Sequence, residues 1–117
     1  MDQNELKTRT KQFALRILKL TAALPKNDEA RAIRNQLARS GTSVAANYRA
    51  SCRARSKAEF IAKIGTVIEE ADESCFWLEL IIEGEFIHRS KVNALLKEAN
   101  EITAIMTASR KTAEEGK

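Results

Sequence analysis

Apolar residues recur at intervals of three and four along almost the whole of this 117-residue chain, and a single proline interrupts the pattern. The interval matches the 3.6-residue turn of an α-helix, so the apolar side chains fall on one face. Good helix formers such as Ala, Leu, Glu and Lys dominate the composition, whereas Gly and Pro are scarce. The pattern therefore predicts an all-α protein.

The periodicity divides the chain into four predicted helices, at about residues 4–23, 29–52, 57–83 and 91–109. Pro25 ends the first, because the residue before a proline is pushed out of the helical region. Either Asn27 or Asp28 is placed to cap the second. Ser56 and Glu59 have the spacing of a capping box at the start of the third.

The remaining boundary signals are Gly84, which predicts the end of the third helix, and Ser90, which predicts a cap for the fourth. Gly41 lies inside the second apolar stripe. A helix-interior glycine costs about 1 kcal/mol relative to alanine, so we expect a neighbouring helix to approach closely there. The tail at 111–117 is polar, and we expect it to fray.

The predicted inward-facing residues are those that keep the helical spacing. In the first two helices they are Leu6, Thr10, Phe13, Ile17, Leu20, Leu24, Ala30, Ile33, Leu37, Gly41, Val44 and Tyr48. In the last two they are Phe60, Ile64, Ile68, Ala71, Cys75, Leu78, Ile82, Val92, Leu95, Leu96, Ala99, Ile102 and Met106. Four such helices with short joints predict one domain, residues 1–117, folded as an antiparallel up-down four-helix bundle.

Charge is distributed unevenly along the chain. Residues 1–57 hold 13 Lys and Arg against 4 Asp and Glu, a balance of +9, whereas residues 58–117 hold 7 against 12, a balance of −5. This asymmetry indicates either an acidic partner for the first half or head-to-tail contact between copies of the chain. Two ordinary solvated faces remain the alternative.

The second helix and the joint after it form a basic face without an acidic residue between Ala30 and Ala58. Arginine forks suit phosphate oxygens, so this face is a candidate for binding the backbone of RNA or DNA. Pairing with acidic residues of another subunit and plain solvation remain open. The candidate residues are Arg31, Arg39, Arg49, Arg53, Arg55 and Lys57.

The third helix projects Phe76, Trp77 and Leu80 away from its inward stripe, with Glu69 and Glu73 on the same outer face. An exposed aromatic patch is typical of an interface, and Trp is a typical anchor. We therefore predict that these five residues form an oligomer interface. An apolar surface with a basic rim, such as the second helix of another copy, would fit it and close a ring. The alternative is that the helices splay and bury all five.

No catalytic or metal-binding pattern stands out. His88 is the only histidine and lacks a nucleophile with an orienting partner, so we interpret it as structural or solvated. Cys52 and Cys75 are interpreted as free thiols rather than a disulfide or zinc site. Ser43 and Asn47 have the spacing to bond each other or nearby backbone. We expect no enzyme activity, no metal and no cofactor.

We expect a cytoplasmic protein. No stretch approaches the roughly 18 apolar residues of a membrane span, and the first five residues are polar and acidic, unlike a secretory signal.

Four segments of the chain resemble a known family: SGTSVAANYR at 40–49, RARSKAEFIAKIG at 53–65, EADE at 70–73 and WLEL at 77–80. They are similar to the bacterial four-helix-bundle proteins encoded by intervening sequences in ribosomal RNA genes. The accessory variability determinant of diversity-generating retroelements is a related protein. The resemblance covers most of the chain and is strongest from Gln36 to Leu80.

The resemblance implies a homopentameric ring without catalytic residues. For the retroelement relative it also implies a basic surface that engages nucleic acid and a reverse transcriptase. Ala50 departs from the glutamate that the resemblance leads us to expect, which removes a carboxylate beside the basic face.

The function predicted from the sequence is therefore a non-enzymatic oligomeric adaptor that binds structured RNA or DNA through phosphate contacts. Its partners would be itself, RNA or DNA, and a reverse transcriptase or other protein, without a membrane. The alternative is a protein-interaction scaffold whose charged faces serve only subunit assembly.

Overall fold

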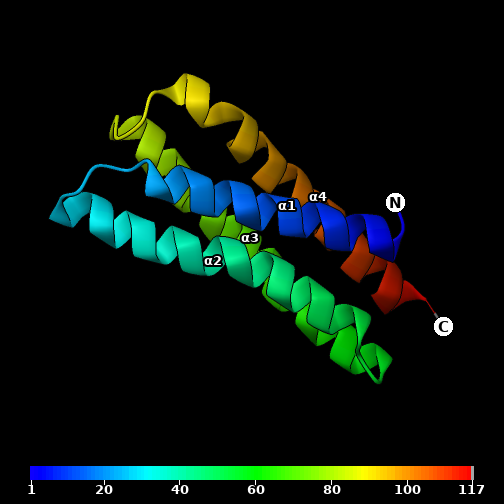
Figure 1. The fold of residues 1–117 in the computed structure, drawn as a ribbon. Helices are drawn as coiled ribbons and strands as arrows, with labels where there is room; N and C mark the ends of the chain where they lie inside the picture. Colours follow the sequence, from blue (N-terminus) through cyan, green and yellow to red (C-terminus); the bar gives the residue numbers. More distant parts are fainter. Residues whose placement is uncertain (117) are drawn as a thin grey trace.

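The computed structural model describes residues 1–116, which form four long α-helices and one short 3-10 turn. The elements in chain order are α1 (Gln3–Ala22), α2 (Asp28–Cys52), α3 (Lys57–Glu83), η1 (Arg89–Lys91) and α4 (Asn93–Glu115). The helices alternate in direction, so both termini lie at the same end of the bundle (Figure 1). The prediction of an all-α, up-down four-helix bundle is confirmed.

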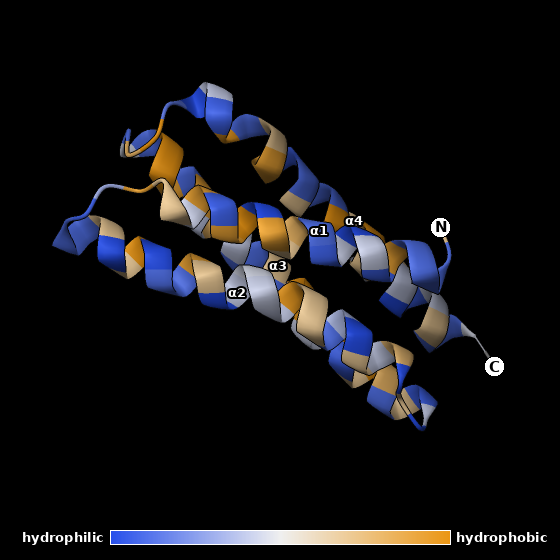
Figure 2. Ribbon diagram, viewed as in Figure 1, coloured by the Kyte–Doolittle hydropathy of each residue, from blue (hydrophilic) through white to orange (hydrophobic). Residues whose placement is uncertain are grey.

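The four helices are not packed equally. α2 packs extensively against both α1 and α3, and α3 packs against α4, whereas α1 touches α4 over a much smaller area. α1 and α3 therefore occupy opposite corners of the bundle, and the seam between α1 and α4 is the weakest of the four. Hydrophobic residues recur along every helix, as the orange bands of Figure 2 show.

The helix starts follow capping chemistry. Asn27 Oδ1 accepts a hydrogen bond of 2.8 Å from the backbone N–H three residues on, and Ser56 Oγ accepts one of 3.0 Å from Glu59 N–H. Both caps are confirmed. The capping box that starts α1 was not predicted: Asp2 Oδ1 accepts from Glu5 N–H at 2.8 Å, and Glu5 Oε1 accepts from Asp2 N–H at 3.0 Å.

The predicted end of α3 is confirmed, but its mechanism differs. Gly84 has an ordinary φ of −82°, and it is Glu85 that takes the left-handed conformation, with φ 57°. Phe86 N–H bonds Ile81 O at 3.0 Å and Glu85 N–H bonds Ile82 O at 3.1 Å, which is a Schellman motif. Gly84 provides space instead: a Cβ there would lie 2.6 Å from the Phe86 ring.

Two predictions about α4 were wrong. Ser90 does not cap α4 but lies inside η1, where His88 Nδ1 accepts a 3.1 Å bond from Ser90 N–H. α4 begins at Asn93 without a side-chain cap. It also continues to Glu115, beyond the expected end near 109, and Lys57 at the start of α3 donates a hydrogen bond to Gly116 O. This contact supports the last turn that we expected to fray; Lys117 lies outside the described residues.

The inward stripes of α1 and α2 are confirmed, with Leu20 only half-buried. Gly41 marks a close approach of α2 to α1, because a Cβ built there would lie 2.7 Å from Ile17 Cγ2. In α4, Leu96 is half-buried and the other predicted positions are buried.

The buried face of α3 is rotated towards α2 relative to the prediction. Phe60, Ile68 and Ile82 are half-buried, whereas the fully buried positions include Val67, Ser74 and Ile81. Small residues of the two helices meet on this face: the Oγ atoms of Ser40 and Ser74, both fully buried, lie 2.9 Å apart. None of the helices formed by residues 1–116 combines the length and hydropathy that crossing a bilayer requires.

Candidate nucleic-acid interface

The basic face predicted on α2 is divided by the packing of its neighbours. Arg39 turns towards α3, where its Nη1 donates to both carboxylate oxygens of Glu70 at 3.1 Å and its Nη2 donates to Glu73. The hydrogen bond to Glu73, and then that to Glu70, raise the pKa of the Arg39 guanidinium. Arg39 is therefore paired within its own chain and lies apart from the other arginines predicted to bind phosphate.

Arg49 and Arg53 turn the other way and meet two lysines of α1. Together with Lys7 and Lys11 they line a groove of about 570 Å³ between the C-terminal half of α2 and the N-terminal half of α1. Its other lining residues are short: Thr8, Thr42, Ala45 and Ala46. We call this set the cationic groove. Within residues 1–116, none of its four cations takes part in an ion pair.

The sequence reasoning missed Lys7 and Lys11. They are one helical turn apart on the exposed side of α1, in a segment, 6–27, that has no Asp or Glu. That acid-free segment was the available signal. Which face of α1 meets Arg49 and Arg53 depends on how the two helices are rotated about their axes, and the helical spacing of either helix alone does not give that rotation.

The other predicted phosphate-binding residues do not line the groove. Arg31 is exposed near the start of α2, where Nη2 lies 3.8 Å from Asp28 Oδ1. Arg55 is exposed in the joint two residues beyond Arg53. Lys57 is engaged with the carbonyl of Gly116.

The predicted interface residues on α3 are only partly exposed. Phe76 is 50% exposed and meets the half-buried Trp77 edge to face, with ring centroids 5.0 Å apart. Leu80 is half-buried against the core, and Glu69 is exposed. Phe76 is therefore the most exposed large apolar side chain of α3.

Glu73 has a role inside the chain. The indole Nε1 of Trp77 donates to Glu73 Oε2 at 3.1 Å, and Arg39 donates to the same oxygen. The Trp77 bond, followed by the Arg39 bond, lowers the pKa of the Glu73 carboxyl. Arg39, Glu73 and Trp77 thus form a network that joins α2 to α3.

Two further polar side chains singled out in the sequence, Asn47 and Cys75, have partners within the chain. Asn47 Nδ2 donates to Ser43 O at 2.9 Å. Cys52 and Cys75 are free thiols; Cys75 donates to Asn100 Oδ1 at 3.5 Å, and burial raises its pKa to about 11. Among residues 1–116, no group of three or more His, Cys, Asp or Glu side chains is arranged to hold a metal ion.

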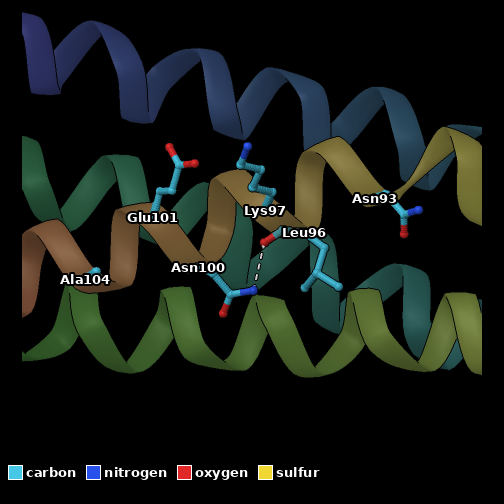
Figure 3. A pocket seen from close by; sticks show the side chains of 6 residues that line it. All are labelled: Asn93, Leu96, Lys97, Asn100, Glu101 and Ala104. Carbon is cyan, nitrogen blue, oxygen red and sulfur yellow. Dashed lines mark hydrogen bonds between the residues drawn. The ribbon is translucent and has the colours of Figure 1, made fainter.

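A second hollow, of about 540 Å³, lies along α4 (Figure 3). It gathers only one cation, Lys97, and two of its polar side chains are already engaged: Glu101 pairs with Arg9 of α1, and Asn100 donates to Leu96 O at 3.2 Å. The cationic groove is therefore the stronger candidate for a binding site.

Comparison with known proteins adds a family and a fold. Residues 2–108 match the family of the 23S rRNA-intervening sequence protein. The chain is similar to a solved structure from Bacteroides thetaiotaomicron VPI-5482, a protein of unknown function from the S23 ribosomal protein family. The two share 35% identity with a TM-score of 0.88, over 96% of this chain and 100% of the other. No protein with a curated description matches the chain. Because the match spans most of its length, the chain belongs to the 23S rRNA-intervening sequence protein family.

Proposed function

We propose that the protein is a non-enzymatic, homo-oligomeric adaptor that binds the phosphate backbone of nucleic acid in the cationic groove. Structured RNA is the nucleic acid that we propose as its main ligand. The observation that supports it is the convergence of Lys7, Lys11, Arg49 and Arg53 from two helices on one groove, where none of the four forms an ion pair with any residue of the part of the chain that the structure describes. A cluster of uncompensated cations attracts phosphate, and released counterions add to the affinity.

The shape of the groove favours backbone contact over base reading. Ala45, Ala46 and Thr42 line its α2 side, so a phosphate can approach the helix surface closely. Lysine and arginine contacts to phosphate fix position but carry no sequence information. We therefore expect recognition of RNA shape and charge rather than of a base sequence. The family name, which refers to 23S rRNA, supports RNA as the first nucleic acid to test.

The experiment measures retention of a structured RNA by the purified protein across a salt series. Arg49→Glu with Arg53→Glu should abolish retention, because it places carboxylates beside phosphates. Lys7→Gln should reduce the steepness of the plot of log affinity against log salt concentration by about 1, which corresponds to the loss of one phosphate contact. The matched control, Lys97→Glu with Lys111→Glu, makes the same change in net charge at exposed positions of α4 and should retain RNA.

Retention by the Arg49→Glu, Arg53→Glu protein, with its helical content and unfolding midpoint unchanged, would contradict the site. Equal loss in the α4 control would show that net charge, not the groove, attracts the RNA.

The second candidate is a scaffold that uses its charges only for assembly, with the half-exposed Phe76 at the contact between subunits. The pairing of Arg39 with Glu70 and Glu73 favours it, because it shows one arginine of the basic face serving helix packing. A scaffold would retain no RNA even at low salt, where phosphate contacts are strongest. For either candidate the proposed oligomer is a ring, and the family resemblance implies five subunits. For the adaptor, the resemblance also implies a reverse transcriptase or other protein as a further partner.

A further inference from the structure

The outer face of α1 carries two exposed leucines in a cationic setting. Leu15 is 53% exposed and Leu18 is 43% exposed, and because they lie three residues apart on one helix they form a single apolar patch. Two exposed lysines flank Leu15: Lys11, which also lines the cationic groove, lies one turn before it, and Lys19 lies one turn after it. We call these four residues the α1 docking face.

The outer face of α3 also combines an exposed apolar side chain with charged neighbours, but here the charges are negative. Phe76 is half exposed, and its ring is held edge to face by Trp77. No Lys or Arg occurs in residues 64–88. The exposed acidic side chains within two turns of Phe76 are Glu69, Asp72, Glu79 and Glu83. Phe76 and these four carboxylates make up the α3 docking face.

The two faces cannot meet within one molecule. α1 and α3 occupy opposite corners of the bundle, so their outer faces point away from each other. Each face offers an apolar centre with a charged rim, and the rims have opposite sign. Such a pair suits contact between different surfaces of two copies, which is a heterologous interface.

We propose that the α1 docking face of one copy binds the α3 docking face of a second copy, with Leu15 and Leu18 packed on Phe76 and the lysines facing the carboxylates. The inference deepens the homo-oligomeric part of the proposed function, on which it rests. It replaces α2 with α1 as the surface that receives Phe76, because the exposed leucines lie on α1.

The test uses two full-length variants, each with one face disabled, and measures mass in solution by light scattering. Leu15→Glu places a carboxylate against the acidic face, and Phe76→Ser removes the aromatic anchor. Each variant alone should be a monomer. An equimolar mixture should form a 1:1 dimer and nothing larger, because only one productive pair of faces remains. Ala108→Glu, at an exposed position of α4, is the charge control and should keep the wild-type mass.

A monomeric wild-type protein would overturn the proposal, as would wild-type mass in either variant. Monomers that fail to pair in the mixture would also overturn it, because the two faces would then not be partners. Both sites are exposed, so the unfolding midpoints should stay near that of wild type. If a variant unfolds, Lys19→Glu replaces Leu15→Glu, and Glu79→Lys replaces Phe76→Ser. Each replacement is measured alone, and each should have a lower mass in solution than wild type. Wild-type mass in both would overturn the proposal.

RNA retention is measured on the same samples and separates this proposal from the function. Wild-type protein that retains RNA as a monomer would overturn the docking faces and leave the cationic groove standing. Assembly as described without RNA retention would support the docking faces and favour the scaffold.

Discussion

At Gly41 α2 approaches α1 closely, and the absence of a Cβ at this residue makes room for Ile17. An alanine Cβ there would lie 2.7 to 3.0 Å from three side-chain atoms of Ile17, which is fully buried and stiff at χ1. Overpacking of this kind costs about 1–3 kcal/mol, whereas alanine gains up to about 1 kcal/mol in helix propensity. We therefore expect Gly41→Ala to destabilise the bundle by about 1 kcal/mol in urea unfolding.

Gly65 in α3 supplies the matched control. A Cβ at Gly65 would meet only Arg110 Nη1, at 4.0 Å, so Gly65→Ala should stabilise the protein by about 0.5–1 kcal/mol. The same substitution should thus have opposite signs at the two sites. If Gly41→Ala were as stable as wild type, the close approach would not be a constraint.

At the scale of elements, the network of Arg39, Glu73 and Trp77 joins α2 to α3 and should respond to pH. The pKa of Glu73 is lowered on folding, so its contribution to stability is present above its ordinary value of 4.5 and is lost as pH falls through the folded value. Glu73→Gln should therefore reduce stability at neutral pH and make the decline on acidification below pH 4.5 shallower.

Chemical unfolding at a series of pH values between 7 and 3 measures this. Trp77→Phe removes the N–H that contributes most to the lowered pKa and should also make the decline shallower. If the free energy of unfolding fell in parallel for wild type and Glu73→Gln between pH 7 and 3, the proposed link between Glu73 ionisation and stability would be refuted.

Across the whole molecule, the seam between α1 and α4 is the least packed of the four, and Arg9 bridges the two helices. Its Nε and Nη2 donate to Glu98 at 2.7 Å each, and Nη2 also donates to Glu101 at 2.8 Å. These bonds raise the pKa of the Arg9 guanidinium, with Glu98 the largest cause. A forked pair with limited exposure is stronger than an ordinary surface pair.

We expect Arg9→Gln to lower the free energy of unfolding by about 1 kcal/mol, with a smaller effect in high salt. Arg31→Gln is the control, because it removes only an exposed 3.8 Å contact with Asp28 and should change stability little. Thermal unfolding at low and high salt compares the two. Equal effects would mean that the seam does not rely on Arg9.

The candidate site was only half predictable. The acid-free run in α2 pointed to Arg49 and Arg53, and both line the cationic groove. The same run contained Arg39, yet carboxylates more than thirty residues away in sequence pair with it. No pattern local to α2 shows that pairing, since it depends on α3 lying against one side of α2 and α1 against the other.

The four helices, most of their buried residues and the caps at Asn27 and Ser56 could be predicted from the amino-acid sequence, because a 3.6-residue repeat and capping hydrogen bonds are local. The rotation of each helix about its axis could not, because it follows from packing against the other helices. That rotation brings Lys7 and Lys11 beside Arg49, turns Arg39 to Glu73 and leaves Leu15, Leu18 and Phe76 exposed. The physical reason is that neighbouring residues differ by about 100° around a helix, so small shifts in packing change which side chains meet.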